Sequence, residues 1–219
     1  MASSSTPLPQ ARGGRERAAN AAIIALFGLL PALFVADVAR KAIFEAFVHV
    51  DFPEQLAIKV EQLPLIFPIH MLTGGLALLL FPAVIAFRRW RRIHRLLGRI
   101  AAIDVAIAGL TALPVAWVAP VSPWSAAGFI VQALTWMTFL GFGIWNIRNG
   151  RPGPHRKAML LMVATASGAV FFRIYLALWA ILGSPQHFVL FYSFDSWVAW
   201  LGPLTLTAYG LRRGWKILT

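Results

Sequence analysis

The sequence predicts an all-α membrane protein, a bundle of six transmembrane helices with both termini in the cytoplasm. Two observations carry this prediction: the chain is unusually apolar, and its charges fall between apolar runs long enough to cross a bilayer. Of its 219 residues, 59% are hydrophobic and 13% are charged, whereas a soluble domain is about half apolar and about a quarter charged. We therefore expect lipid to be the solvent of most of its surface.

A helix needs about 20 residues to cross the hydrocarbon core. Six apolar runs are close to this length. They cover residues 19–38, 63–87, 96–118, 125–147, 158–182 and 196–211, and the last lengthens if residues 188–195 enter the interface. A mixed segment, 39–62, follows the first run, and its apolar pattern predicts an amphipathic helix on the membrane surface, interrupted at Pro53. Residues 1–18 and 214–219 are predicted cytoplasmic tails, the first of them disordered.

The distribution of basic residues predicts the orientation. Arg88 to Arg99, read as RRWRRIHRLLGR, holds six arginines, which places this turn at a membrane surface. If both termini and the turns at 88–99 and 148–157 share one side, that side holds 16 of the 20 Lys and Arg residues. Cytoplasmic loops carry such an excess, so we expect a multi-pass protein of the bacterial cytoplasmic membrane. Six of the eight acids, Asp195 among them, fall on the other side in this scheme.

Composition and motifs exclude several classes of function. A net charge of +12 is typical of nucleic-acid binding, but the arginines sit between membrane spans, so we expect lipid and membrane-protein partners and no nucleic acid. The absence of cysteine excludes disulfides and thiolate chemistry. No phosphate-binding loop, HExxH, GxSxG or dinucleotide fingerprint is present, so no metal site is predicted.

Three polar residues lie within the predicted spans, where an ionisable group is a functional candidate. His70 is about 10 Å and Arg173 about 13 Å from the outer membrane surface, and Asp104 is about 12 Å from the inner one. Asp104 is the predicted partner of Arg173, with Asp37 as the alternative. The competing interpretation is that these groups fix helix packing and carry no chemistry.

A repeated His-Arg dipeptide is the second functional candidate. His94-Arg95 and His155-Arg156 each stand at the predicted inner start of a span. Two facing imidazoles can ligate haem iron, so this pair predicts a b-type haem, with Arg95, Arg99 and Arg156 as contacts of the propionates. The alternative is that both dipeptides only anchor their helices at the phospholipid surface.

Four segments resemble the bacterial membrane-protein family called domain of unknown function 2306. They are His70 with the glycines of its span, HRLLGR at 94–99, HRKAM at 155–159 and FRIYLAL at 172–178. The resemblance covers about residues 63–209, with Phe81-Pro82 where the family is expected to have Gly-Pro. It implies a polytopic membrane protein and marks His70, His94, His155 and Arg173 as family-like positions, but it supplies no reaction.

The sequence leaves three functions open. The first is a haem-b membrane redox protein, which is also loosely similar to transmembrane b-type cytochromes. The second is a non-catalytic accessory or assembly subunit of a larger membrane complex. The third is a transporter or proton pathway that uses Asp104 and Arg173, although Pro82, Pro114 and Pro203 do not form the matched helix breaks of many transporters.

Overall fold

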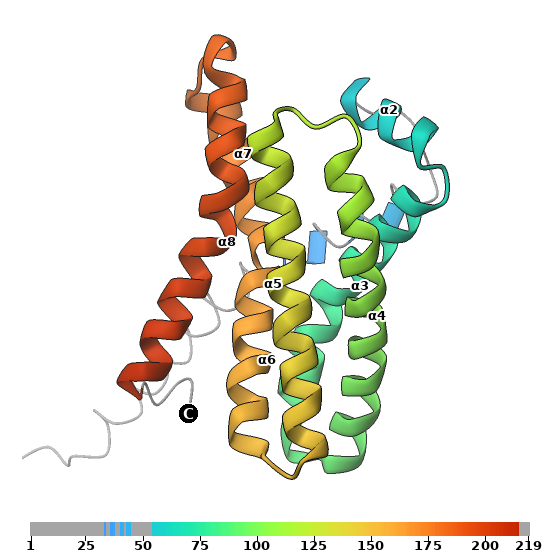
Figure 1. Ribbon diagram of the computed structural model, residues 1–219, viewed down its shortest axis with the longest axis vertical. Coiled ribbons are helices and arrows are strands. Elements are labelled where there is room, and N and C mark those ends of the chain that lie inside the picture. Colours follow the sequence, from blue (N-terminus) through green and yellow to red (C-terminus); the bar gives the residue numbers. More distant parts are fainter. Residues whose placement is uncertain (1–32, 34–35, 38–39, 42, 45–53, 215–219) are drawn as a thin grey trace, which may run out of the picture.

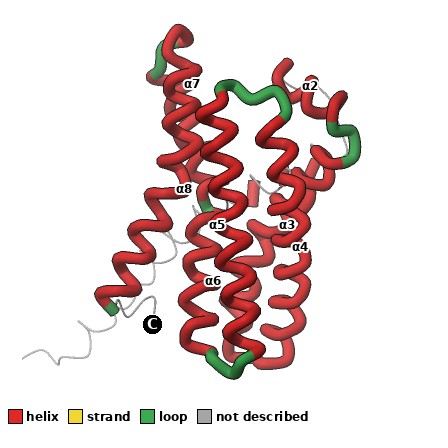
Figure 2. The backbone as a smooth tube through the Cα atoms, viewed as in Figure 1, coloured by secondary structure: helices red, strands yellow, loops and turns green. Residues whose placement is uncertain are grey.

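A computed structural model describes residues 33, 36–37, 40–41, 43–44 and 54–214. All secondary structure in this part of the chain is helical (Figures 1 and 2). The elements are α2 (Glu54–Gln62), α3 (Ile66–Ala86), η1 (Phe87–Arg89), α4 (Arg91–Trp117), α5 (Pro123–Arg148), α6 (Pro152–Ala166), α7 (Gly168–Leu182), η2 (Pro185–His187) and α8 (Phe188–Arg213). The first predicted span and the segment before Glu54 lie almost wholly outside the described residues.

Helices α3 to α6 form an antiparallel four-helix bundle. Buried side chains from all four meet in one core, made of Ala77 and Phe81 of α3, Val105 of α4, Leu140 of α5, and Met162 and Ala166 of α6. Short turns join α3 to α4 and α5 to α6 at the same end of the bundle (Figure 1), and we call it the arginine-rich end because residues 88–99 and 148–157 lie there. The far end holds α2, the α4–α5 loop and the α7–α8 turn.

Four stretches of the described chain are long and apolar enough to cross a membrane: Ile66–Arg89, Arg91–Trp117, Pro123–Arg148 and Pro152–Leu182. The protein is therefore an all-helical membrane protein with several apolar helices. The total of six spans and the cytoplasmic position of the termini remain predictions.

The fourth of these stretches is broken in its middle, because α6 ends at Ala166 and α7 begins at Gly168. Ser167 lies between them, and its hydroxyl donates to the carbonyl of Ala164, 2.7 Å away. Gln132 of α5 donates its side-chain amide to the carbonyl of Thr165 at 3.0 Å. A Ser-Gly pair and an inserted side chain are common causes of a helix kink, because they replace the helix's own hydrogen bonds. We attribute the break to these two contacts.

Two glycines allow α8 to lie against α5 and α7. A Cβ atom at Gly128 would be 2.5 Å from the hydroxyl of Ser196, and one at Gly168 would be 2.5 Å from the Cβ of Trp200. Both distances are too short for any larger residue, so the helix backbones meet directly, as small residues allow in membrane bundles. Figure 1 shows the second half of α8, which contains Pro203, leaning away from α6.

Helix α2 is attached to the far end of α4 by Lys59. The ammonium group of Lys59 donates to the carbonyl of Val115 at 2.7 Å and to the carbonyl of Val118. These carbonyls lie at the C-terminus of α4, where backbone acceptors lack partners in their own helix and a positive charge is favourable. Burial lowers the pKa of Lys59. Lys59 therefore caps α4 and holds α2 against the bundle.

Candidate functional site

His94 joins the start of α4 to the end of α3. It is the fourth residue of α4, at the arginine-rich end, and its ring Nδ1 lies 3.0 Å from the carbonyl oxygen of Val84. Val84 belongs to the last turn of α3, where carbonyl groups have no partner within the helix. The contact satisfies that carbonyl and fixes the orientation of the half-buried imidazole.

His155 makes the matching contact in the second hairpin. It is the fourth residue of α6, and its Nδ1 lies 2.9 Å from the carbonyl oxygen of Gly143 in α5. Gly143 has no side chain to hold α6 away, since a Cβ there would lie 2.1 Å from the Cε of Met159. The same contact thus arises twice, at the same helix position and the same end of the bundle.

These contacts determine which nitrogen of each ring carries the hydrogen. A carbonyl oxygen can only accept a hydrogen bond, so Nδ1 of His94 and Nδ1 of His155 must be the donors. In a neutral imidazole the other nitrogen, Nε2, then keeps its lone pair. A backbone carbonyl that accepts from one ring nitrogen while the other binds metal is the usual outer contact of a metal-bound histidine. In the neutral form, each of the two rings therefore keeps the lone pair of its Nε2.

Both histidines lie on the core-facing stripes of their helices. Val105 is eleven residues after His94, and Ala166 is eleven residues after His155, which is three helical turns in each case. Val105 and Ala166 belong to the central core. The two imidazoles therefore continue the core stripes of α4 and α6 at the arginine-rich end.

The predicted propionate contacts lie on the same end of the bundle and are exposed. Arg95 donates its Nε to the carbonyl of Arg91 at 3.2 Å. Arg99 and Arg156 are exposed residues. Nearby, the guanidinium of Arg151 lies 5.5 Å from the ring centre of Trp145. The side chains that the sequence predicted together thus share one end of the bundle.

His70 is a third imidazole bound to backbone, toward the far end. Its Nδ1 lies 3.2 Å from the carbonyl oxygen of Ala108 and 3.3 Å from the hydroxyl of Thr111, both on α4. His70 therefore joins α3 to α4 in the half of the bundle that the other two histidines do not reach.

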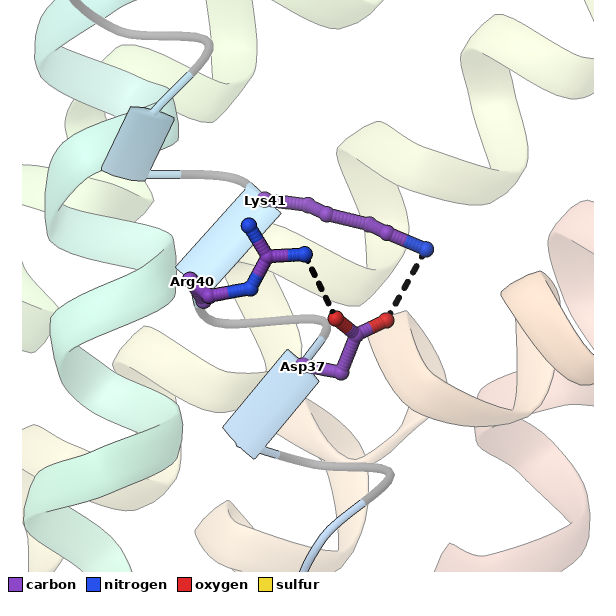
Figure 3. Close-up of polar contacts among 3 residues, drawn as sticks. All are labelled: Asp37, Arg40 and Lys41. Atoms are coloured by element: carbon purple, nitrogen blue, oxygen red, sulfur yellow. Dashed lines mark hydrogen bonds and ion pairs between the residues drawn. The ribbon is translucent and has the colours of Figure 1, made fainter.

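Arg173 does not pair with either carboxylate that the sequence suggested. One of its terminal nitrogens donates to the carbonyl of Ala169 at 2.8 Å, one turn back toward the middle of the bundle. Asp104 is 7% exposed, and its Oδ2 finds no hydrogen-bond partner within the described residues. Asp37 is bound by Arg40 at 2.8 Å and Lys41 at 2.9 Å, as the dashed lines in Figure 3 show. The expected pair of Arg173 with Asp104 is therefore not formed.

Sequence reasoning placed Asp195 in an outer segment, whereas the structure places it inside the bundle. Helix α8 begins at Phe188, so Asp195 lies two turns into it, 4% exposed. Neither of its carboxyl oxygens has a hydrogen-bond partner among the described residues. The run FVLFYSF before Asp195 was the signal, because six of its seven residues are aromatic or strongly apolar and extend the span toward Phe188. Among the residues that the structure covers, no three His, Asp or Glu side chains gather as a metal site.

Comparison with protein-family models identifies the family of the chain. The model of a family described as a predicted membrane protein, DUF2306, matches residues 67–210, which is more than half of the chain. The match runs from the second residue of α3 into the last turn of α8, so it includes every histidine contact described above. No curated protein and no solved structure matches. The chain belongs to the DUF2306 family of predicted membrane proteins.

Proposed function

We propose that the protein binds a b-type haem through His94 and His155 and acts as a membrane redox protein. The observation that carries the proposal is that each imidazole donates Nδ1 to a backbone carbonyl, which leaves Nε2 as the free, electron-donating nitrogen. Two neutral imidazoles on core-facing stripes of separate helices are the donor set that a six-coordinate haem iron takes. When bound, such a group supplies one-electron transfer.

The arginines at the arginine-rich end could bind the propionate groups of the same haem. Haem carries two propionate carboxylates, and guanidinium groups bind carboxylates with two parallel hydrogen bonds. Arg95, Arg99 and Arg156 stand within about one turn of the two histidines, and their exposed guanidinium groups reach the membrane surface. The role of these side chains is to hold the propionates at the surface, while the carbonyl contacts hold the imidazole planes.

Optical spectroscopy tests the proposal directly. The protein is produced in cells supplied with a haem precursor and purified in mild detergent, and reduced-minus-oxidised spectra are recorded. We expect the alpha and Soret bands of a six-coordinate b-type haem, with one haem per chain by the pyridine haemochrome method. His94→Ala and His155→Ala should each lose these bands, whereas His187→Ala, a histidine outside both stripes, should keep them. A wild-type protein with no haem bands would end the proposal, as would bands that survive both substitutions.

We also propose that the protein lies in the bacterial cytoplasmic membrane with its arginine-rich end in the cytoplasm. Ten basic residues fall in the two turns at this end, and in the described chain after Gln62 the only acids are Asp104 and Asp195, both buried. An excess of basic residues in short loops favours the cytoplasmic side.

A further inference from the structure

The end of α5 presents an exposed pair of stacked aromatic rings beside a basic turn. Phe142 is 51% exposed and Trp145 is 52% exposed, and their ring centres lie 6.0 Å apart. Indole rings near the ends of membrane helices lie at the level of the lipid headgroups. The turn that follows contributes four of the basic residues of the arginine-rich end, Arg148, Arg151, Arg156 and Lys157. Apolar surface and positive charge are thus exposed side by side.

Arg151 lies over one of these rings. Its guanidinium carbon is 5.5 Å from the ring centre of Trp145, a distance at which a cation is attracted to the face of an indole. A guanidinium group carries five N–H donors in its own plane. No side-chain hydrogen bond or ion pair within the described residues uses those of Arg151. Within this part of the chain, the donors therefore remain available to an acceptor from outside.

The turn fixes the position of Arg151 through its backbone. Gly150 has a φ of 67°, a left-handed conformation that glycine adopts readily. The backbone amide of Arg151 donates to the carbonyl of Asn146 at 2.9 Å. Asn146 is itself 2% exposed, and its side-chain amide donates to the carbonyl of Phe142 at 2.8 Å. The backbone that carries the guanidinium group and the two rings is therefore ordered in advance, which lowers the entropy cost of binding a ligand.

The positive charge of the arginine-rich end is not balanced by acids of the described chain. Ten basic residues fall in its two turns. Between residues 63 and 214 the only acids are Asp104 and Asp195, and both are buried within their helices. Neighbouring cations repel one another, so an anion bound from outside is stabilised by several of them at once. Phosphate is an anion to which a guanidinium group can donate two parallel hydrogen bonds.

We propose that Phe142, Trp145 and Arg151 bind an anionic phospholipid, with Arg148 as a second cation. The phosphate accepts hydrogen bonds from the N–H groups of Arg151, and an acyl chain lies along the two rings. Arg148 is three residues after Trp145 and therefore stands on the same face of α5. A zwitterionic lipid brings its own ammonium group, which these cations repel, so the site prefers a headgroup with a net negative charge. A free phosphate ion lacks the acyl chain that covers the rings.

Native mass spectrometry of the full chain tests this proposal. The protein is stripped of lipid in mild detergent and titrated with one lipid at a time. We expect phosphatidylglycerol to bind about 25-fold more tightly than phosphatidylcholine with the same acyl chains, about fivefold for each of the two arginines. Arg151→Gln should weaken the binding of phosphatidylglycerol about fivefold and leave that of phosphatidylcholine unchanged. Phe142→Ala should weaken the binding of both lipids equally, because it removes exposed apolar surface and no charge.

Arg213 of α8 provides the matched control. Its guanidinium carbon lies 5.4 Å from the ring centre of Tyr209, but its Nε already donates to the Tyr209 hydroxyl at 3.1 Å. Arg213→Gln should therefore keep the wild-type preference, and a large excess of inorganic phosphate should not displace the lipid. Equal affinity for the two lipids, a preference that survives Arg151→Gln or is lost equally in Arg213→Gln, or displacement by inorganic phosphate would overturn the proposal. None of these residues is assigned to haem, so the result does not depend on haem.

Discussion

The two ends of the bundle differ in where their charged groups lie: they are exposed at the arginine-rich end and turned inward at the far end. At the arginine-rich end the cations are exposed, and the polar contacts of His94 and His155 go to backbone carbonyls of the neighbouring helix. At the far end, polar groups turn inward: Lys59 reaches two carbonyls of α4, Arg173 reaches one of its own helix, and Asp195 reaches none. The exposed cations therefore mark the ends of the helices, whereas the partner of each buried polar group is determined by which helices pack together.

The largest expected effect concerns the sidedness of these two ends. Reporter fusions after residues 92 and 152 should be active only as cytoplasmic reporters, and fusions after residues 122 and 186 only as reporters of the opposite side. The reason is the excess of basic residues in the turns at the arginine-rich end. A fluorescent protein that folds in the cytoplasm and a phosphatase that is active outside it give the paired readout. If either pair reports the other side, the assignment of the ends is wrong.

Next in size is the loss of the α8 contact at the far end. Gly128→Val should reduce thermal stability by about 3 kcal/mol, the upper range for overpacking, because its side chain would overlap Ser196. Gly141→Val is the matched control, since a Cβ at Gly141 meets nothing within 4 Å. Thermal unfolding in detergent, followed by circular dichroism, measures both. Equal melting temperatures for the two variants would show that α8 does not dock through Gly128.

A smaller loss is expected when Arg173 is removed. Arg173→Leu should cost about 2 kcal/mol, the range for hydrogen bonds made by a charged group. Arg173→Lys should recover only part, because an ammonium group lacks the planar fork of guanidinium. The same melting experiment compares both with the wild type. If Arg173→Leu melts like the wild type, the inward contact of Arg173 does not contribute to the fold.

The smallest expected effect is the loss of the cap on α4. Lys59→Met keeps the length of the side chain but removes its donors, and it should cost about 1 kcal/mol, typical of a cation at a helix C-terminus. Glu61→Gln, at an exposed position of the same helix, should change stability little. Hydrogen exchange of the backbone amides in the last turn of α4 reports the local effect. Unaltered protection there would mean that Lys59 does not cap the helix.

The sequence correctly predicted the family and the two turns of the arginine-rich end, but not the surroundings of Arg173 and Asp195. Family membership could be inferred from short segments such as HRLLGR and HRKAM, and the family match confirms it. The pairing of Arg173 with Asp104 was wrong, because depth along a helix says nothing about which face each residue occupies or which helices are neighbours. The burial of Asp195 was missed because a carboxylate beside a proposed loop is usually solvated, and only the packing of α8 on α5 and α7 removes that solvent.

The break at Ser167 also escaped sequence reasoning. The run from Ala158 to Leu182 is apolar without interruption, and it contains no proline, so nothing in its pattern requires an end. The break coincides with a contact from Gln132, which lies on a different helix and donates to the Thr165 carbonyl. Such a side chain cannot be assigned to its carbonyl before the neighbouring helices are known.

The same break bears on how a stretch longer than the hydrocarbon thickness can lie in a bilayer. The stretch Pro152–Leu182 has 31 residues, so as one straight helix it would measure about 46 Å, against a hydrocarbon thickness of about 30 Å. A single rod of this length must tilt as a whole or leave apolar side chains in water. Two rods joined at Ser167 can each take a separate tilt, so α6 stays aligned with the four-helix core while α7 follows α8. A change in bilayer thickness can then be met by a change of angle at Ser167, which lies three turns away from His155.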